Sequence, residues 1–128
     1  MRLVQISDLH LWTHDDDART VRYLDNAAEH PNGADNLGSL RAVLDDVEAC
    51  EGDFSRVDRL VITGDIAQDE QRETYVLLRQ VLEERGLLER TLCLPGNHEQ
   101  RAFLREVFPS SAVQGHGGFS ADVCGFWK

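Results

Sequence analysis

The sequence has 128 residues, the length of one domain, and its 13 basic and 23 acidic residues give a formal net charge of −10. This acidic balance argues against non-specific binding of nucleic acid and against docking on an anionic membrane surface. Hydrophobic residues make up 41% of the chain and charged residues 28%, which excludes wholesale disorder. By charge alone, the chain is poorly suited to a negatively charged ligand.

Three short apolar runs rich in β-branched residues predict strands at residues 3–6, 60–63 and 91–94. Residues with helical periodicity separate them. Asn36 is the expected cap of a first helix with Leu37, Leu40, Val43, Leu44 and Val47 on one face. A second helix is expected from Asp69 to near Gly86, and a third at residues 100–108. This alternation predicts an α/β fold with a largely parallel sheet.

Two segments break the alternation. Residues 11–35 form a long polar insertion, which we expect near a functional site, with one short helix at residues 21–28. Residues 119–123 alternate as a strand would, and a further apolar run begins at Phe126, two residues before the last residue of the sequence. This pattern predicts a domain over residues 1–128 that is truncated at its C-terminus.

The start of the chain and its cysteines predict a cytoplasmic protein. Residues 3–6 follow Met1 and Arg2 with no signal peptide before them, and no apolar stretch is long enough to span a bilayer. The three cysteines, Cys50, Cys93 and Cys124, form no C-x-x-C pair and are expected to be free thiols.

Polar residues follow each predicted strand: Asp8 and His10 the first, Asp65 the second, and Asn97 and His98 the third. Because the carboxyl ends of parallel strands meet at one edge of a sheet, these residues should converge there. Carboxylate, imidazole and amide oxygen together suit divalent ions such as Mn, Fe, Zn or Mg. A bridging carboxylate would hold two ions roughly 3.5–4 Å apart, the spacing used for phosphoester hydrolysis.

Each cluster also has a structural alternative. Asp-x-His occurs often by chance, and Gly-Asp is a common turn. The third cluster can simply begin a helix, with Asn97 as its cap and Glu99 in its first turn. The three clusters together, each directly after a strand, favour the metal site.

The motifs Ile-Ser-Asp-Leu-His-Leu (6–11), Thr-Gly-Asp-Ile-Ala-Gln-Asp (63–69) and Leu-Pro-Gly-Asn-His-Glu (94–99) resemble the calcineurin-like metallophosphoesterase superfamily. The second motif, followed by Tyr75, is most similar to bacterial class III 3',5'-cyclic nucleotide phosphodiesterases. The resemblance implies that the chain is the N-terminal half of an αββα sandwich.

By this resemblance, Asp8 and His10 ligate a first metal ion, Asp65 bridges two ions and Asn97 ligates the second. The two divalent ions (Mn, Fe, Zn or similar) are of unknown identity. His98 would be catalytic rather than a ligand, stabilising the phosphate or protonating the leaving oxygen. Glu99 would orient the His98 ring. The residues expected near a bound phosphate are His10, Asp65, Asn97 and His98.

The implied reaction is hydrolysis of a 3',5'-cyclic nucleotide, such as cyclic AMP, to the 5'-monophosphate by a hydroxide that two metal ions activate. The expected partner is thus a small phosphoester, not a nucleic acid or a membrane. Two alternatives remain: another substrate, such as a phosphomonoester or a nucleotide-sugar, or a truncated non-catalytic module.

The resemblance also implies ligands that this chain lacks: a later histidine and a Gly-His-x-His motif. His116 lies in Gly-His-Gly-Gly and is expected in a surface turn, and His14 and His30 are expected to be solvated. The 128 residues alone are therefore expected to have little or no activity.

Overall fold

A parallel sheet of three strands forms the centre of the computed structural model, which describes residues 1–52, 54–96 and 99–108. The strands are β1 (Leu3–Ile6), β2 (Arg59–Thr63) and β3 (Thr91–Leu94), in the spatial order β1-β2-β3. Leu3 pairs with Arg59, and Leu60 pairs with Thr91. The predicted strands and the predicted α/β class with a parallel sheet are confirmed.

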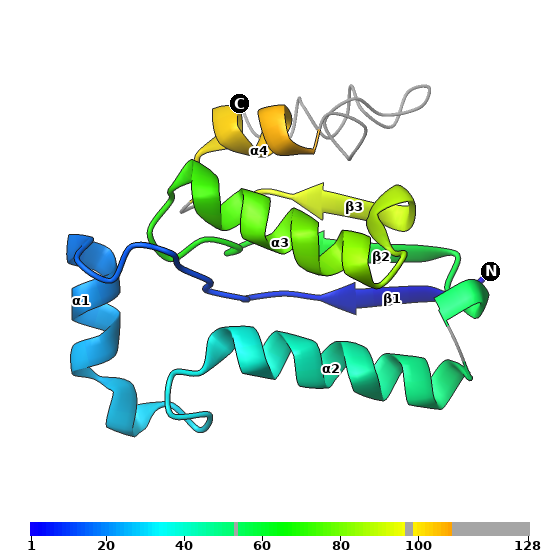
Figure 1. Ribbon diagram of the computed structural model, residues 1–128, viewed down its shortest axis with the longest axis horizontal. Coiled ribbons are helices and arrows are strands. Elements are labelled where there is room, and N and C mark those ends of the chain that lie inside the picture. Colours follow the sequence, from blue (N-terminus) through cyan, green and yellow to red (C-terminus); the bar gives the residue numbers. More distant parts are fainter. Residues whose placement is uncertain (53, 97–98, 109–128) are drawn as a thin grey trace.

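Helices follow each strand. They are α1 (Ala18–Asp25), α2 (Asn36–Glu51), α3 (Arg72–Glu84) and α4 (Arg101–Val107), with short 3-10 turns at Ala27–Glu29, Phe54–Arg56 and Leu88–Arg90. Both crossovers, β1-α2-β2 and β2-α3-β3, advance across the sheet in the same direction. Right-handed connections therefore place α2 and α3 on the same face, while α1 lies beyond the carboxyl ends of the strands (Figure 1).

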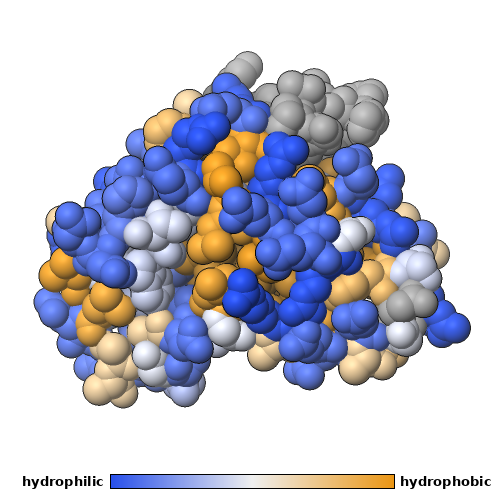
Figure 2. Space-filling view, viewed as in Figure 1, coloured by the Kyte–Doolittle hydropathy of each residue, from blue (hydrophilic) through white to orange (hydrophobic). Residues whose placement is uncertain are grey.

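The hydrophobic core lies between the sheet and these two helices. Ile62 of β2, Leu44 of α2 and Leu78 of α3 are completely buried. Full burial of one such side chain stabilises the fold by roughly 1.5–3 kcal/mol. On the outer surface of this face, hydrophobic residues form a band between hydrophilic ones (Figure 2).

Helix α2 begins with a cap different from the predicted one. Asp35, not Asn36, is the N-cap, and its carboxylate accepts a hydrogen bond from the Gly38 amide. The Asn36 side chain is drawn away because it donates to the His10 carbonyl at 2.9 Å. Asp35 thus caps the helix, while Asn36 holds the segment that follows β1.

The insertion at residues 11–35 begins as a continuation of β1. Leu11 is 1% exposed, donates its amide to the Ile66 carbonyl at 2.8 Å and forms a parallel bridge with Ala67. The predicted helix starts earlier than expected, at Ala18, because the Asp17 carboxylate accepts hydrogen bonds from the first free amides of α1.

Cys93 is buried in the core, whereas Cys50 is exposed. Within the described ranges, no helix has the length and apolar character needed to cross a membrane. The predictions for His116, for the strand at residues 119–123 and for Cys124 fall outside the described residues.

Candidate metal centre

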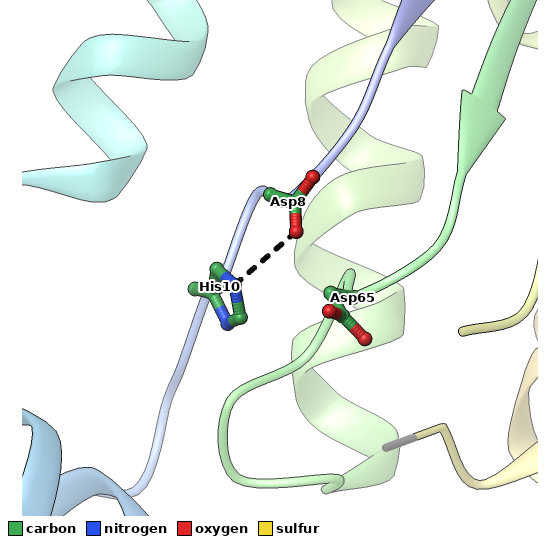
Figure 3. Close-up of side chains that lie close together, drawn as sticks. All are labelled: Asp8, His10 and Asp65. Atoms are coloured by element: carbon green, nitrogen blue, oxygen red, sulfur yellow. Dashed lines mark ion pairs between the residues drawn. The ribbon is translucent and has the colours of Figure 1, made fainter. Parts of the chain in front are cut away.

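Three of the predicted ligands meet beyond the ends of β1 and β2. One ligand atom from each of Asp8, His10 and Asp65 lies within 4.8 Å of the other two. Figure 3 shows Asp8 and His10 pointing toward each other after β1, with Asp65 beside them after β2. Asn97 and His98 lie outside the described residues, so their predicted roles stay predictions.

The backbone at this group is strained. Asp8, His10 and Asp65 have positive φ angles of 57°, 44° and 50°, in the left-handed region that non-glycine residues rarely adopt. Each such residue costs of order 1–3 kcal/mol, and the surrounding structure must hold it in place. Two hydrogen bonds between the turns do so: the Asp8 amide donates to the Gly64 carbonyl at 3.1 Å, and the His10 amide to the Asp65 carbonyl at 2.9 Å.

Glycines allow the turn after β2 to touch the turn after β3. Gly64 has a φ of 100°, and a Cβ built there would lie only 2.9 Å from the Gly96 Cα. A Cβ at Gly96 would in turn collide with the Asp65 carboxylate. The two glycines therefore bring the Asp65 turn against the segment that leads into residues 97–98.

The His10 ring is oriented by Gln68, whose role sequence reasoning did not identify. His10 Nδ1 lies 2.8 Å from Gln68 Oε1, which is an acceptor only, so Nδ1 carries the proton. The Nε2 atom lies 3.8 Å from Asp8 Oδ1 and keeps its lone pair when the ring is neutral. Gln68 belongs to the motif at residues 63–69, and this position was the only sign in the sequence that it could support the site.

The donor set fits a divalent cation. Asp65 Oδ1 is a buried oxygen without a hydrogen-bond partner among the described residues. A buried polar atom without a partner costs about 1–3 kcal/mol, and a cation placed among the three side chains would satisfy it. Two carboxylates and one neutral imidazole are ligands that Mn, Fe or Zn accept.

Glu99 holds the segment after β3 against the segment after β2. Its carboxylate accepts hydrogen bonds from the Ile66 amide and, at 2.5 Å, from the Tyr75 hydroxyl. The Tyr75 hydroxyl also accepts from the Gln100 amide at 3.1 Å. Burial raises the pKa of the Glu99 carboxyl, and burial together with the neighbouring Glu99 raises the pKa of Tyr75. The orientation of His98 by Glu99 stays a prediction.

The insertion contributes an aromatic stack behind His10. The rings of His10 and Tyr23 are stacked with centroids 5.9 Å apart. The His30 ring also stacks on Tyr23, with centroids 4.1 Å apart. The Tyr23 hydroxyl lies 3.0 Å from the Asn36 amide nitrogen, which donates to it. His30 is half-buried and its ring packs on Tyr23, so this histidine is not merely solvated. The predicted proximity of the insertion to the site is confirmed.

The buried carboxylate of Asp69 holds the start of the insertion. It accepts hydrogen bonds from the amides of Thr13 and His14 at 2.8 and 3.0 Å and from the Thr74 hydroxyl. Burial opposes ionisation of this carboxyl, but the hydrogen bonds outweigh that effect and hold its pKa below the usual value. The half-exposed His14 ring lies 3.6 Å from the same carboxylate, so this histidine is not merely solvated.

Two cavities open beside the three candidate ligands. One, of about 520 Å³, is lined by Asp8, Tyr23 and His30 and by apolar side chains of β1 and α2. The other, of about 430 Å³, borders His10 and Gln68 and includes two arginines of α1. Both volumes fall in the range of sites for small molecules.

A comparison with models of protein families matches residues 1–125 to the calcineurin-like phosphoesterases. A search of curated proteins found no match. The family match spans the three motifs and every residue of the site described above.

Proposed function

The chain belongs to the calcineurin-like phosphoesterase family, which makes it a metal-dependent phosphoester hydrolase, and we propose that it cleaves 3',5'-cyclic nucleotides. The superfamily resemblance is confirmed, while the likeness to class III phosphodiesterases stays a prediction. The convergence of Asp8, His10 and Asp65 within 4.8 Å is the observation that supports a metal-dependent hydrolase.

In this proposal, Asp8, His10 and Asp65 hold one divalent ion, and Asp65 shares a second ion with Asn97. When bound, the ions supply positive charge at the phosphate oxygens and lower the pKa of water for attack on phosphorus. Gln68 keeps the His10 Nδ1 protonated and thereby leaves Nε2 free as a ligand atom. His98 is proposed to contact the phosphate and donate a proton to the leaving oxygen.

The substrate proposal rests on the motif at residues 63–69 and on charge. The net charge of −10 disfavours a long polyanion, because each phosphate beyond the site would meet an acidic surface. A small phosphodiester brings a single phosphate to the metal ions and avoids this repulsion.

The test is a substrate panel with Mn²⁺: cyclic AMP, cyclic GMP and bis-p-nitrophenyl phosphate. It is run on the 128-residue chain and on the product of the full reading frame. We expect cyclic nucleotide hydrolysis by the product of the full reading frame and a loss of at least about 100-fold in Asp65→Asn. Asp46→Asn, an exposed carboxylate on α2, is the matched control.

Cleavage of only non-cyclic esters would reject the cyclic nucleotide and keep the hydrolase. Metal binding without turnover by the product of the full reading frame would favour a non-catalytic module instead. One alternative substrate class, the nucleotide-sugars, is favoured by a specific observation: the arginine-lined cavity beside His10.

A further inference from the structure

We propose that the cavity of about 430 Å³ beside His10 binds a second phosphate group of the substrate. We call it the arginine pocket; its lining includes His10, Arg19, Arg22, Tyr23, Asn26 and Gln68. The inference rests on the proposed hydrolase function and extends its substrate class from cyclic mononucleotides to substrates that carry a second phosphate.

Two arginines line the pocket. Arg19 and Arg22 are three residues apart on α1, so both side chains lie on one side of the helix. The side chains that line the pocket include both guanidinium groups and no carboxylate. In a chain of net charge −10, such a pocket is a place where an anion meets attraction rather than repulsion.

The two arginines differ in how they are engaged. Arg19 forms an ion pair with Glu70 at 3.3 Å and donates to the Asp69 carbonyl at 3.5 Å, which fixes its position. Arg22, within the part of the chain that the structure describes, has no side-chain hydrogen bond or ion pair. Arg72 and Arg85, by contrast, each pair with a carboxylate. The N–H groups of the Arg22 guanidinium are therefore available to a ligand. A guanidinium can donate two parallel hydrogen bonds to two oxygens of one phosphate.

The pocket and the candidate metal centre share His10. Its Nε2 faces Asp8, and its Nδ1 donates to Gln68, which lines the pocket. A phosphate bound at the metal centre would thus lie at the Nε2 edge of the imidazole, and the arginine pocket lies at its Nδ1 edge. A ligand that reaches from one to the other passes beside a single ring.

This placement selects a nucleotide phosphodiester that carries a second phosphate. Two sources share this chemistry: a cyclic dinucleotide, with two phosphodiester groups, and a nucleoside-diphosphate ester such as a nucleotide-sugar. A 3',5'-cyclic mononucleotide has one phosphate and would leave the arginine pocket without an anion. A cyclic dinucleotide or a nucleotide-sugar should therefore bind more tightly than a cyclic mononucleotide.

The kinetic test compares KM and kcat for a cyclic mononucleotide, a cyclic dinucleotide and a nucleotide-sugar. For Arg22→Gln we expect KM to rise about tenfold for the two-phosphate substrate that is turned over, with kcat and the mononucleotide KM unchanged. Arg22→Lys should recover part of the loss. Arg41→Gln, the same charge change on the exposed surface of α2, is the matched control. An equal effect of Arg22→Gln on all substrates, or an equal effect of Arg41→Gln, overturns the proposal.

A binding test separates this inference from the hydrolase proposal. The metal-free protein is titrated with inorganic pyrophosphate by calorimetry. We expect weak binding that Arg22→Gln reduces about tenfold, while Asp65→Asn leaves it in place. Pyrophosphate binding without turnover of cyclic nucleotides by the product of the full reading frame supports the pocket and rejects the proposed cyclic nucleotide hydrolysis. Turnover of phosphodiesters with no dependence on Arg22 in either test keeps the hydrolase and rejects the pocket.

Discussion

A single amide side chain decides which nitrogen of His10 faces the candidate metal centre. The Gln68 side-chain oxygen accepts from Nδ1, and the backbone amide of Gln68 donates to the Leu11 carbonyl at 2.7 Å, which holds Gln68 in place. Side chains that hold a ligating imidazole in this way add to its affinity for the metal. Gln68 is thus a positioning residue for a metal ion it does not touch.

Replacing Gln68 by leucine should lower the affinity for Mn²⁺ roughly 10–100-fold, because both tautomers of His10 become available and the ring loses its fixed direction. Calorimetric titration with Mn²⁺ measures the effect, and the ¹⁵N shifts of His10 report the tautomer. Gln71→Leu is the control, since its side chain makes no capping hydrogen bond to α3. Unchanged affinity in Gln68→Leu with an altered tautomer would separate ring orientation from metal binding and refute the prediction.

The sequence predicted three clustered residues of the site but not their supports. Asp8, His10 and Asp65 follow strands directly, so a parallel sheet alone predicts that they meet. Gln68 and Asn36 act through hydrogen bonds to residues far away in sequence, 58 and 26 positions from His10. No local pattern reveals such a contact, because it depends on how the turns pack.

Among the elements, the insertion is held by one buried carboxylate at the end of the turn that leads to α3. Asp69→Asn should destabilise the fold by about 1–3 kcal/mol at neutral pH, because one oxygen becomes an amide group that faces backbone donors. Urea unfolding measures the difference, and hydrogen exchange should show lost protection at Thr13 and His14. Asp46→Asn, an exposed carboxylate, should change little.

The pH dependence of this difference follows from the lowered pKa of Asp69. The stabilisation is fully present above the ordinary pKa of 3.8 and is lost as pH falls through the lower folded-state value. The free-energy difference between wild type and Asp69→Asn should therefore shrink as the pH falls below 4. A difference that grows on acidification would contradict this account.

Two glycine substitutions test whether the close approach between the turns after β2 and β3 is needed. Gly64→Ala and Gly86→Ala both place a Cβ at a positive φ, 100° and 68°, and each should cost about 1–2 kcal/mol of unfolding free energy. Only Gly64→Ala adds a collision, because the space around Gly86 is open. It should in addition lower Mn²⁺ affinity by displacing Asp65, while Gly86→Ala leaves that affinity unchanged. Equal Mn²⁺ affinities in the two variants would show that the approach is not needed.

The elements themselves were largely predictable, and the exceptions have physical reasons. β1 and β3 have the predicted bounds because a short apolar run bounded by polar residues marks each strand. The cap of α2 was assigned one residue late, since Asp35 and Asn36 can both cap a helix and only the tertiary contact to His10 decides between them. The insertion has no periodicity of its own, and its aromatic stack on His10 was therefore not foreseen.

At the scale of the whole molecule, negative charge at the carboxyl edge of the sheet opposes folding until a cation joins it. Asp8 and Asp65 face each other there across strained turns, although the chain already has an excess of ten negative charges. A cation that binds only the folded chain offsets both the repulsion and the buried oxygen of Asp65. Stability and metal binding should therefore be linked.

Mn²⁺ at about 100 times its dissociation constant should raise the free energy of unfolding by about 2.7 kcal/mol, because the unfolded chain lacks the converged site. Urea unfolding with and without Mn²⁺, at constant ionic strength, measures this shift. Asp65→Asn should remove most of it, while the metal-free variant remains as stable as the wild type or becomes more stable, since a buried charge is lost. Asp46→Asn should keep the full shift. If Mn²⁺ stabilised Asp65→Asn as much as the wild type, the ion would be bound elsewhere on the acidic surface and the assignment of the metal centre would be wrong.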